Sequence, residues 1–142
     1  MGSLRAALVI GVVLALVGCS VFPGAAETRA RDFLRVLISK PDDQARLAGL
    51  AVVPAGQTAD ALVQGVGAQV AMSYLRAKHR QGSRLDFSVI STTSRDDRNK
   101  TVIIAVAQRG AAALQMHRAL FRLQLQATAE RGWLVTGVQA GD

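Results

Sequence analysis

Few side chains in this sequence have the type and spacing that catalysis requires. The only cysteine is Cys19, which excludes an intramolecular disulfide, CxxC pairs and the cysteine spacings of zinc and haem sites. Serine nucleophile elbows, phosphate-binding glycine loops and HExxH pairs are also absent. We therefore predict no catalytic residue and no metal site, and we expect that the chain is not an enzyme.

A general base must be buried enough for its pKa to be tuned, and it must lie within reach of a substrate. Asp86 alternates with the apolar residues of a predicted strand, so we expect it to face away from the core. His79 lies in a basic helix end, where it is better explained as a partner of the helix dipole. His117 stands beside Arg118 near the start of another predicted strand. None of the three is a convincing base.

Asp96 and Asp97 are adjacent carboxylates, which raises the question of a metal site. Their neighbours are Arg95 and Arg98, and no other carboxylate is close in sequence to complete an oxygen cage. We therefore interpret this pair as part of a hairpin turn in which the charges are paired.

The role of Cys19 depends on the residues that precede it. Arg5 is the only charge of a short N-terminal region, and an uncharged apolar run over residues 6–17 follows. At a rise of about 1.5 Å per residue, a helix of this length spans roughly 18 Å, whereas a bilayer core is about 30 Å thick. The run therefore indicates a cleaved export signal rather than a permanent span.

The sequence at the end of this run, Leu16, Val17, Gly18 and Cys19, resembles the lipobox of bacterial lipoproteins. The resemblance implies that the first three residues form the signal-processing motif. It also implies that Cys19 carries a diacylglycerol on its sulfur and an acyl chain on its freed amine, with no other cofactor. Two or more acyl chains give stable anchoring. The alternatives are an ordinary secretory signal with a chance cysteine, or a buried cysteine in an uncleaved helix.

This resemblance divides the chain into a signal peptide (1–18), a lipidated cysteine with its linker (19–26) and a single domain (27–142). It places the protein in the bacterial cell envelope. The anchor is expected in the outer membrane facing the periplasm, or on the outer face of the cell membrane in a host with one membrane. The linker reaches at most roughly 25 Å, so the domain stays near the bilayer.

Net charge and composition limit the classes of partner that we expect for this protein. The chain has a net charge of +7 and only 4% aromatic residues, too few for a platform that stacks bases. We therefore predict no nucleic-acid partner. Beside the membrane that holds the anchor, we expect an envelope protein partner and, as counter-charge for the arginines, anionic lipid headgroups.

Hydrophobic periodicity predicts helices first and strands afterwards. Apolar residues at helical spacing favour helices over 27–38 and 41–50, and a third from Thr58 or Asp60 to about residue 80. Gly65 and Gly67 either permit close packing of that third helix or break it in two. Gly82 suits its left-handed cap. The side chains predicted to share one side of this helix are Leu62, Val66, Gln69, Val70, Ser73 and Tyr74.

Beyond Gly82 the period changes to two, which is typical of strands. The predicted strands are 85–93, 101–108, 119–127 and 133–139. Short connections favour an antiparallel meander, and the helices are available to cover its apolar face. We therefore predict an α+β domain with N-terminal helices packed on a curved, four-stranded antiparallel sheet.

This element order over residues 27–139, with a closing Gly-Trp-Leu-Val-x-x-Val pattern at 132–138, resembles the NTF2-like, or cystatin-like, fold. The fold implies a cone between sheet and helix that can hold an apolar ligand. The residues suited to line such a pocket are Met72, Tyr74, Phe87, Phe121, Leu123 and Trp133. A core filled by the same side chains is the alternative.

Three functions remain open. The first is a non-enzymatic envelope lipoprotein that serves as an interaction or accessory module, for instance in a secretion or transport assembly. The second is a carrier or binder of a small apolar ligand in the cone. The third is an isomerase or hydratase, which requires an acidic or histidine side chain that points into the cone. The residues favour the first.

Overall fold

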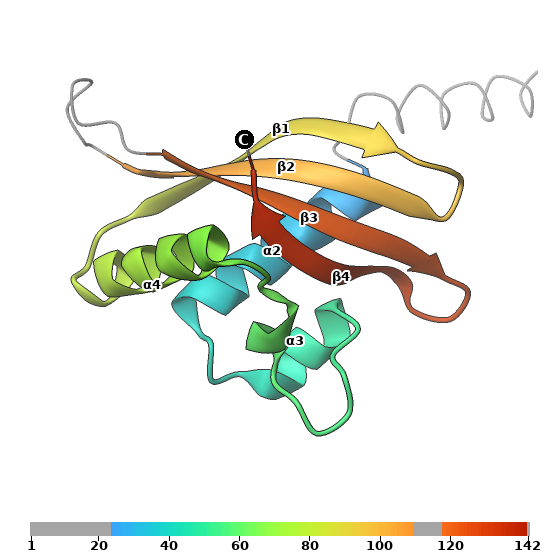
Figure 1. Ribbon diagram of the computed structural model, residues 1–142, viewed down its shortest axis with the longest axis horizontal. Helices are drawn as coiled ribbons and strands as arrows, with labels where there is room; N and C mark the ends of the chain where they lie inside the picture. The colour runs from blue at the N-terminus through green and yellow to red at the C-terminus, as the bar shows by residue number, and fades with distance from the viewer. Residues whose placement is uncertain (1–23, 110–117, 142) are drawn as a thin grey trace, which may run out of the picture.

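The computed structural model describes residues 24–109 and 118–141. The predicted signal, Cys19 and His117 lie outside these residues. Helices cover one face of a four-stranded sheet (Figure 1), which confirms the predicted α+β class. The helical elements are α2 (Ala25–Ser39), α3 (Gln44–Leu50), the short 3-10 helix η1 (Ala59–Leu62) and α4 (Val66–Arg80). The strands are β1 (Leu85–Ser94), β2 (Asn99–Gln108), β3 (Arg118–Thr128) and β4 (Gly132–Ala140).

The strands form the predicted antiparallel meander in the order β1-β2-β3-β4. Along β3, Phe121, Leu123 and Leu125 are buried, while the residues between them are partly or fully exposed, as a period of two requires. The register shifts once on β1, at Ile90, and once on β4, at Thr136. An extra residue of this kind bends a strand and increases its twist, so the strands bend as they cross α2 (Figure 1).

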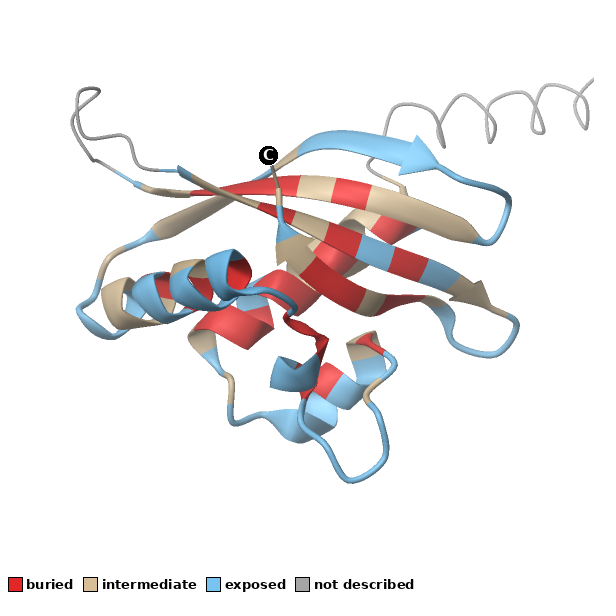
Figure 2. Ribbon diagram, in the orientation of Figure 1, coloured by how far each residue is buried: buried red, intermediate tan, exposed pale blue. Residues whose placement is uncertain are grey.

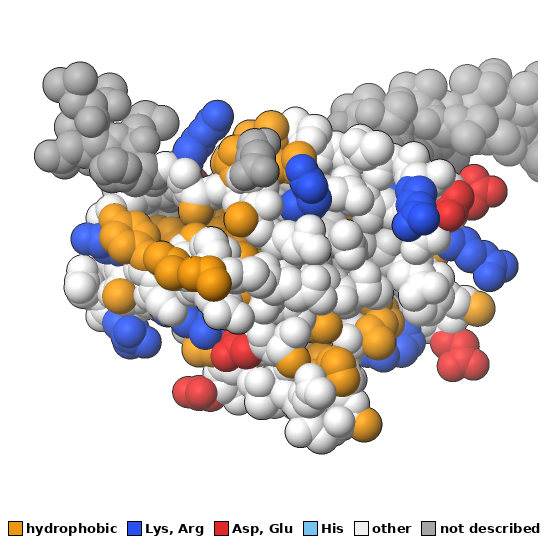
Figure 3. Space-filling view, in the orientation of Figure 1, with side chains coloured by type: hydrophobic (Ala, Val, Ile, Leu, Met, Phe, Trp, Pro, Cys, Tyr) orange, Lys and Arg blue, Asp and Glu red, His pale blue; other side chains and the backbone are white. Residues whose placement is uncertain are grey.

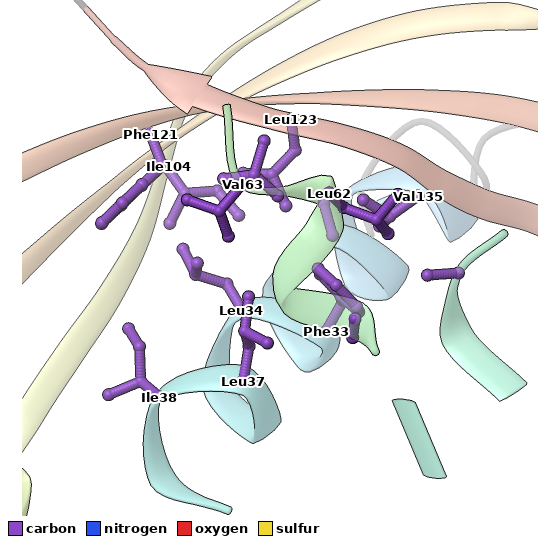
Figure 4. Packing of buried hydrophobic residues seen from close by; sticks show 14 of the residues in the cluster. Phe33, Leu34, Leu37, Ile38, Leu62, Val63, Ile104, Phe121, Leu123 and Val135 are labelled. Carbon is purple, nitrogen blue, oxygen red and sulfur yellow. The ribbon is translucent and has the colours of Figure 1, made fainter. Parts of the chain in front are cut away.

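The core is centred on α2, which contacts α3, α4 and all four strands. Its Phe33, Leu34 and Leu37 are fully buried, and Ile104 and Phe121 of the sheet are buried opposite them (Figure 4). Complete burial of one large apolar side chain contributes about 1.5–3 kcal/mol relative to exposure. Buried residues follow α2 and the inner side of the sheet (Figure 2). Among the described residues, buried side chains therefore fill the layer between α2 and the sheet.

Two extended segments cover the outer edge of β4. The Val52 N–H donates to the Val135 carbonyl at 2.9 Å, and the Gln64 N–H donates to the Val138 carbonyl at 2.8 Å. Both belong to short parallel bridges. A bare strand edge can pair with another chain, so these bridges protect β4 as well as holding the helical layer against it.

α2 starts two residues earlier than predicted. Gly24 has an extended backbone and occupies the N-cap position, so Ala25 and Ala26 of the predicted linker are helical. Ala26 is almost completely buried. The linker prediction is therefore wrong for these two residues, because small side chains that looked suited to a linker also fit where the helix meets the core.

α3 starts later than predicted. The predicted start was Pro41, but the helix begins only after Asp43. The carboxylate of Asp43 accepts a hydrogen bond from the Arg46 N–H at 3.2 Å, which satisfies one of the free donors at a helix start. This side-chain cap outweighs the preference of proline for a first helical turn.

The predicted third helix is broken in two, which is one of the two outcomes that the glycine pair allowed. Gly65 separates η1 from α4 and has φ +92° and ψ 149°, a conformation that is essentially restricted to glycine. Gly67, by contrast, is an ordinary helical residue of α4. Gly82 has φ +88°, which confirms its role in ending the helix.

Arg76 ties the two pieces together. Its Nε donates to the Leu37 carbonyl at 3.0 Å, and its Nη2 donates to Asp60 Oδ1 at 2.6 Å. The Arg76 side chain is only 18% exposed. A partly buried ion pair therefore joins α4 to η1, and the same guanidinium satisfies a carbonyl near the end of α2.

Substitution of the two glycines by alanine should have opposite effects. Gly65→Ala forces a side chain into a glycine-only conformation and should lower the free energy of unfolding by about 1–3 kcal/mol. Gly67→Ala should raise it by up to about 1 kcal/mol, because alanine favours the helix and its Cβ would meet Ala140 Cβ at an ordinary 3.6 Å. Urea unfolding followed by circular dichroism measures both. Equal effects of the two variants would contradict this account of the break.

Candidate functional site

The structure does not bring the predicted pocket residues together. Phe121 is fully buried and Met72 is 3% exposed, and both belong to the core, as does the fully buried Leu123. Tyr74 is 45% exposed on another side of α4. These residues do not line one cavity, because side chains already fill the layer between α2 and the sheet.

The other two predicted pocket residues lie far apart along the sheet. Phe87 is on β1, where the Arg35 guanidinium carbon lies 5.4 Å from the centre of its ring. Trp133 is the second residue of β4, and Lys100 Nζ lies 5.1 Å from the centre of its ring. Both aromatic rings therefore act as platforms for a cation at the margin of the core.

Asp86 is not placed as a general base. Its side chain is 44% exposed, in agreement with the prediction that it faces away from the core. Arg109 Nη2 donates to Asp86 Oδ1 at 2.6 Å, and Arg109 Nε donates to the same oxygen at 3.0 Å. These hydrogen bonds lower the pKa of Asp86. A carboxylate held ionised by a guanidinium is a weak proton acceptor.

The other side chains considered for catalysis or metal binding lie apart from one another. His79 is exposed in the last turn of α4. Asp96 accepts hydrogen bonds from the Arg98 N–H at 2.8 Å and from Asn99 Nδ2 at 3.0 Å, which lower its pKa. The predicted turn is present, but hydrogen bonds rather than an arginine ion pair hold Asp96. Within residues 24–109 and 118–141, no three histidine, cysteine or acidic residues are grouped closely enough for a metal ion.

The most prominent surface feature is a row of apolar side chains on α4. Val66, Val70 and Tyr74 follow one another at intervals of four residues and are 76%, 63% and 45% exposed. We call these three residues the α4 row. Figure 3 shows hydrophobic side chains gathered over this helix. Isolated exposed apolar residues are common, whereas a contiguous patch marks an interaction surface more often.

The sequence placed the α4 row and Leu62 on one side of a single helix without deciding which side is buried. In the structure the α4 row is exposed, Leu62 is buried in the separate η1, and the buried residues of α4 are Ala68, Met72 and Leu75. Both rows have helical spacing, and the sequence gives more apolar bulk to the exposed one. α4 packs against α2 and β4, and the small Ala68 permits that approach. The presence of two apolar rows was the available signal of a helix with two packing surfaces.

A shallow groove continues the row towards β3. It has a volume of about 460 Å³ and a mostly apolar lining. Its lining residues are Gly67, Val70, Ala71, Tyr74, Leu75, Arg118 and Ala119. The groove therefore adds a mostly apolar hollow beside the helix.

The charged side chains beside Tyr74 and the groove are basic. α4 contains no aspartate or glutamate. Lys78 Nζ lies 5.5 Å from the centre of the Tyr74 ring, and Arg118 borders the groove. A partner that places carboxylates beside its own apolar side chains would complement this surface.

Comparisons with known proteins yield remote similarity only. No protein-family model and no curated protein matches the chain. Among solved structures, a domain of unknown function with a cystatin-like fold from Nostoc punctiforme has a TM-score of 0.44 at 15% identity, covering 83% of this chain and 77% of that one. The intermembrane space region of the chloroplast protein ARC6 has a TM-score of 0.30 at 10% identity, covering 80% of this chain and 91% of that one. The α+β class of this chain rests on its own element order and strand pairing.

The Asp86–Arg109 pair should be visible in a pH titration. The folded-state pKa of Asp86 is lowered, so the pair stabilises the fold above the ordinary aspartate pKa and this contribution is lost as the pH falls through the lowered value. NMR titration of the Asp86 carboxyl should give a midpoint below the ordinary value. Arg109→Gln should raise that midpoint and Arg84→Gln should not. An unchanged midpoint in Arg109→Gln would show that another group lowers the pKa.

The two apolar rows of α4 should differ sharply in their contribution to stability. Met72→Ala removes a buried side chain and should lower the free energy of unfolding by about 2–5 kcal/mol. Val70→Ala alters an exposed position and should change it by no more than about 0.5 kcal/mol. Chemical denaturation of both variants provides the measurement. A large loss in Val70→Ala would mean that this side chain is buried.

Proposed function

We propose that this chain is a membrane-anchored envelope lipoprotein whose folded domain is a non-enzymatic interaction module. The observation that carries the proposal is the exposed α4 row with its basic border. We assign the protein to the bacterial cell envelope, either at the outer membrane facing the periplasm or on the outer face of a single membrane. A secretion or transport assembly is a setting in which such a module would serve.

The anchor would keep this surface close to the bilayer. α2 begins at Ala25, so at most about 20 Å of extended chain separates Cys19 from the first helical residue. Within the described part of the chain, no helix is long and apolar enough to cross a membrane. A lipid on Cys19 would therefore supply the attachment, and it would limit the partners to proteins that work near the same membrane.

The α4 row defines the chemistry of the protein partner. Removal of apolar surface from water is favourable by roughly 25 cal/mol per Å². A partner that covered Val66, Val70 and Tyr74 would therefore gain binding free energy. An amphipathic helix is the simplest occupant of a helix face beside a shallow groove. Since Lys78 and Arg118 border the surface, we propose a partner helix with an apolar face flanked by acidic residues.

The filled interior supports a role at the surface over the alternative of an apolar carrier. Phe33, Leu34 and Phe121 are fully buried where the cone of such a carrier would be. An isomerase or hydratase would also need an acid or base there. The described core contains no buried polar or charged residue, which favours a module without catalytic activity.

The anchor is tested by growing the host with an alkyne-bearing fatty acid. The full-length protein should become labelled and sediment with membranes. Cys19→Ala should abolish the label and accumulate as an unprocessed form, whereas Ser20→Ala should keep the label. An unlabelled wild-type protein would overturn the lipoprotein assignment and leave the domain as a module of another kind.

The interaction surface is tested in the same cells with a photo-crosslinking amino acid. Placed at Val66 or Val70, it should yield the same discrete protein adduct, whereas at the exposed Ser91 on β1 it should not. Charge reversal by Lys78→Glu should reduce that adduct, and a second reversal of an acidic residue in the identified partner should restore it. Equal adducts at Val70 and Ser91, or none at the α4 row, would overturn the surface assignment.

A further inference from the structure

A second surface feature lies apart from the α4 row, at the open end of the helical layer. It is a cleft of about 550 Å³. The carboxyl-terminal ends of α2 and α4 border it on one side. The start of β1 and the end of β2 border it on the other. Segments from four elements thus meet around one hollow.

The rim of this cleft is strongly basic. Arg35, Arg84, Arg109 and His79 all line it, and each of the four is exposed. Among the described residues, the only ion pair made by these arginines is that of Arg109 with Asp86. Asp86 is not among the lining residues and pairs with only one of the three guanidinium groups, so the cleft carries a net positive charge.

The rim has a defined geometry. The Arg109 N–H donates to the Arg84 carbonyl at 2.7 Å, which fixes these two residues side by side across β1 and β2. Arg35 stacks over Phe87 with 5.4 Å between its guanidinium carbon and the ring centre. Gln108 Nε2 donates to Ser83 Oγ at 2.9 Å. The contact with the Phe87 ring restrains the Arg35 guanidinium, and the backbone hydrogen bond fixes the main chain of Arg84 beside Arg109.

The floor of the cleft is apolar. Ile38 of α2 and Leu85 and Phe87 of β1 line it below the arginines. Ile38 is almost completely buried, whereas Leu85 and Phe87 are partly buried. A ligand that only carried charge would leave this floor in water, and a purely apolar ligand would leave the guanidinium groups without a partner.

The helix ends offer another explanation for the arginines. The carboxyl-terminal end of a helix carries about half a negative charge, and the cleft borders two such ends. This partial negative charge would explain the position of His79, which lies in the last turn of α4. It does not account for Arg84 and Arg109, which belong to the strand side of the cleft, nor for the apolar floor between them.

We propose that this cleft binds an amphiphilic anion, with a carboxylate or phosphate head held by Arg35 and Arg84 and an alkyl segment on Ile38, Leu85 and Phe87. Guanidinium groups bind both head types through paired, charge-assisted hydrogen bonds. The ligand is either a free fatty acid or alkyl phosphate, or the head and upper chain of an anionic membrane lipid. The proposal depends on neither the Cys19 anchor nor the α4 row.

The full-length protein in nanodiscs of phosphatidylcholine allows a direct test. The probe is an alkyl phosphate with a diazirine in its chain, and its crosslinks are mapped by mass spectrometry. We expect adducts on the peptide that contains Leu85 and Phe87. The variant Arg35→Gln/Arg84→Gln should weaken the apparent affinity at least about tenfold, equivalent to about 1.4 kcal/mol. Arg46→Gln, on the exposed side of α3, should leave it unchanged.

Two further arms identify the source and exclude trivial binding. A diazirine-bearing phosphatidic acid within the nanodisc should label the same peptide if a membrane lipid is the ligand, whereas labelling by the free probe alone indicates a soluble amphiphile. The neutral diazirine alcohol of the same chain length should label weakly. Equal labelling by this alcohol, an unchanged affinity in the double variant with an unchanged circular dichroism melt, or no adduct in this peptide would overturn the proposal.

Discussion

The structure depends on the burial of one helix face against one sheet face. α2 contacts all four strands of the sheet and the helices α3 and α4, and its Phe33, Leu34 and Leu37 are fully buried. With a single cysteine in the sequence, no intramolecular disulfide is available to stabilise the domain, so the apolar core must do so. That requirement explains why large side chains fill the layer between α2 and the sheet, where the fold resemblance would place a ligand.

The filled core moves the candidate binding surfaces to the outside, and α4 contributes to both of them. One side of α4 packs into the core through Ala68, Met72 and Leu75. Another side presents the α4 row to solvent. The end of the helix borders the basic cleft at His79. Arg76 holds the helix in this position through its contacts with Leu37 and Asp60.

The two surfaces differ in chemistry and suit different ligands. The α4 row is apolar with a basic border, which fits an amphipathic protein segment. The cleft has guanidinium groups above an apolar floor, which fits a small amphiphilic anion. For the proposed lipid-anchored domain, these two proposed roles are compatible. A partner on the α4 row would leave the opening between α2, α4 and β1 accessible.

The sequence alone was sufficient for the α+β class, the meander, the buried side of β3 and the end of the third helix at Gly82, whereas it left open whether Gly65 breaks that helix. These features follow from local periodicity, since a period of two in Phe121, Leu123 and Leu125 allows only one buried side, and glycine is needed at φ +88° in Gly82. The lipobox is also a purely local pattern and remains a sequence-based proposal.

Only the tertiary structure decided which row of α4 is buried, because both rows have helical spacing and the choice depends on how closely α2 and β4 approach Ala68. It also placed the predicted pocket residues apart and assembled the cleft from α2, α4, β1 and β2. Contacts between residues far apart in the chain depend on the packing of whole elements. The spacing of residues along the sequence does not determine that packing.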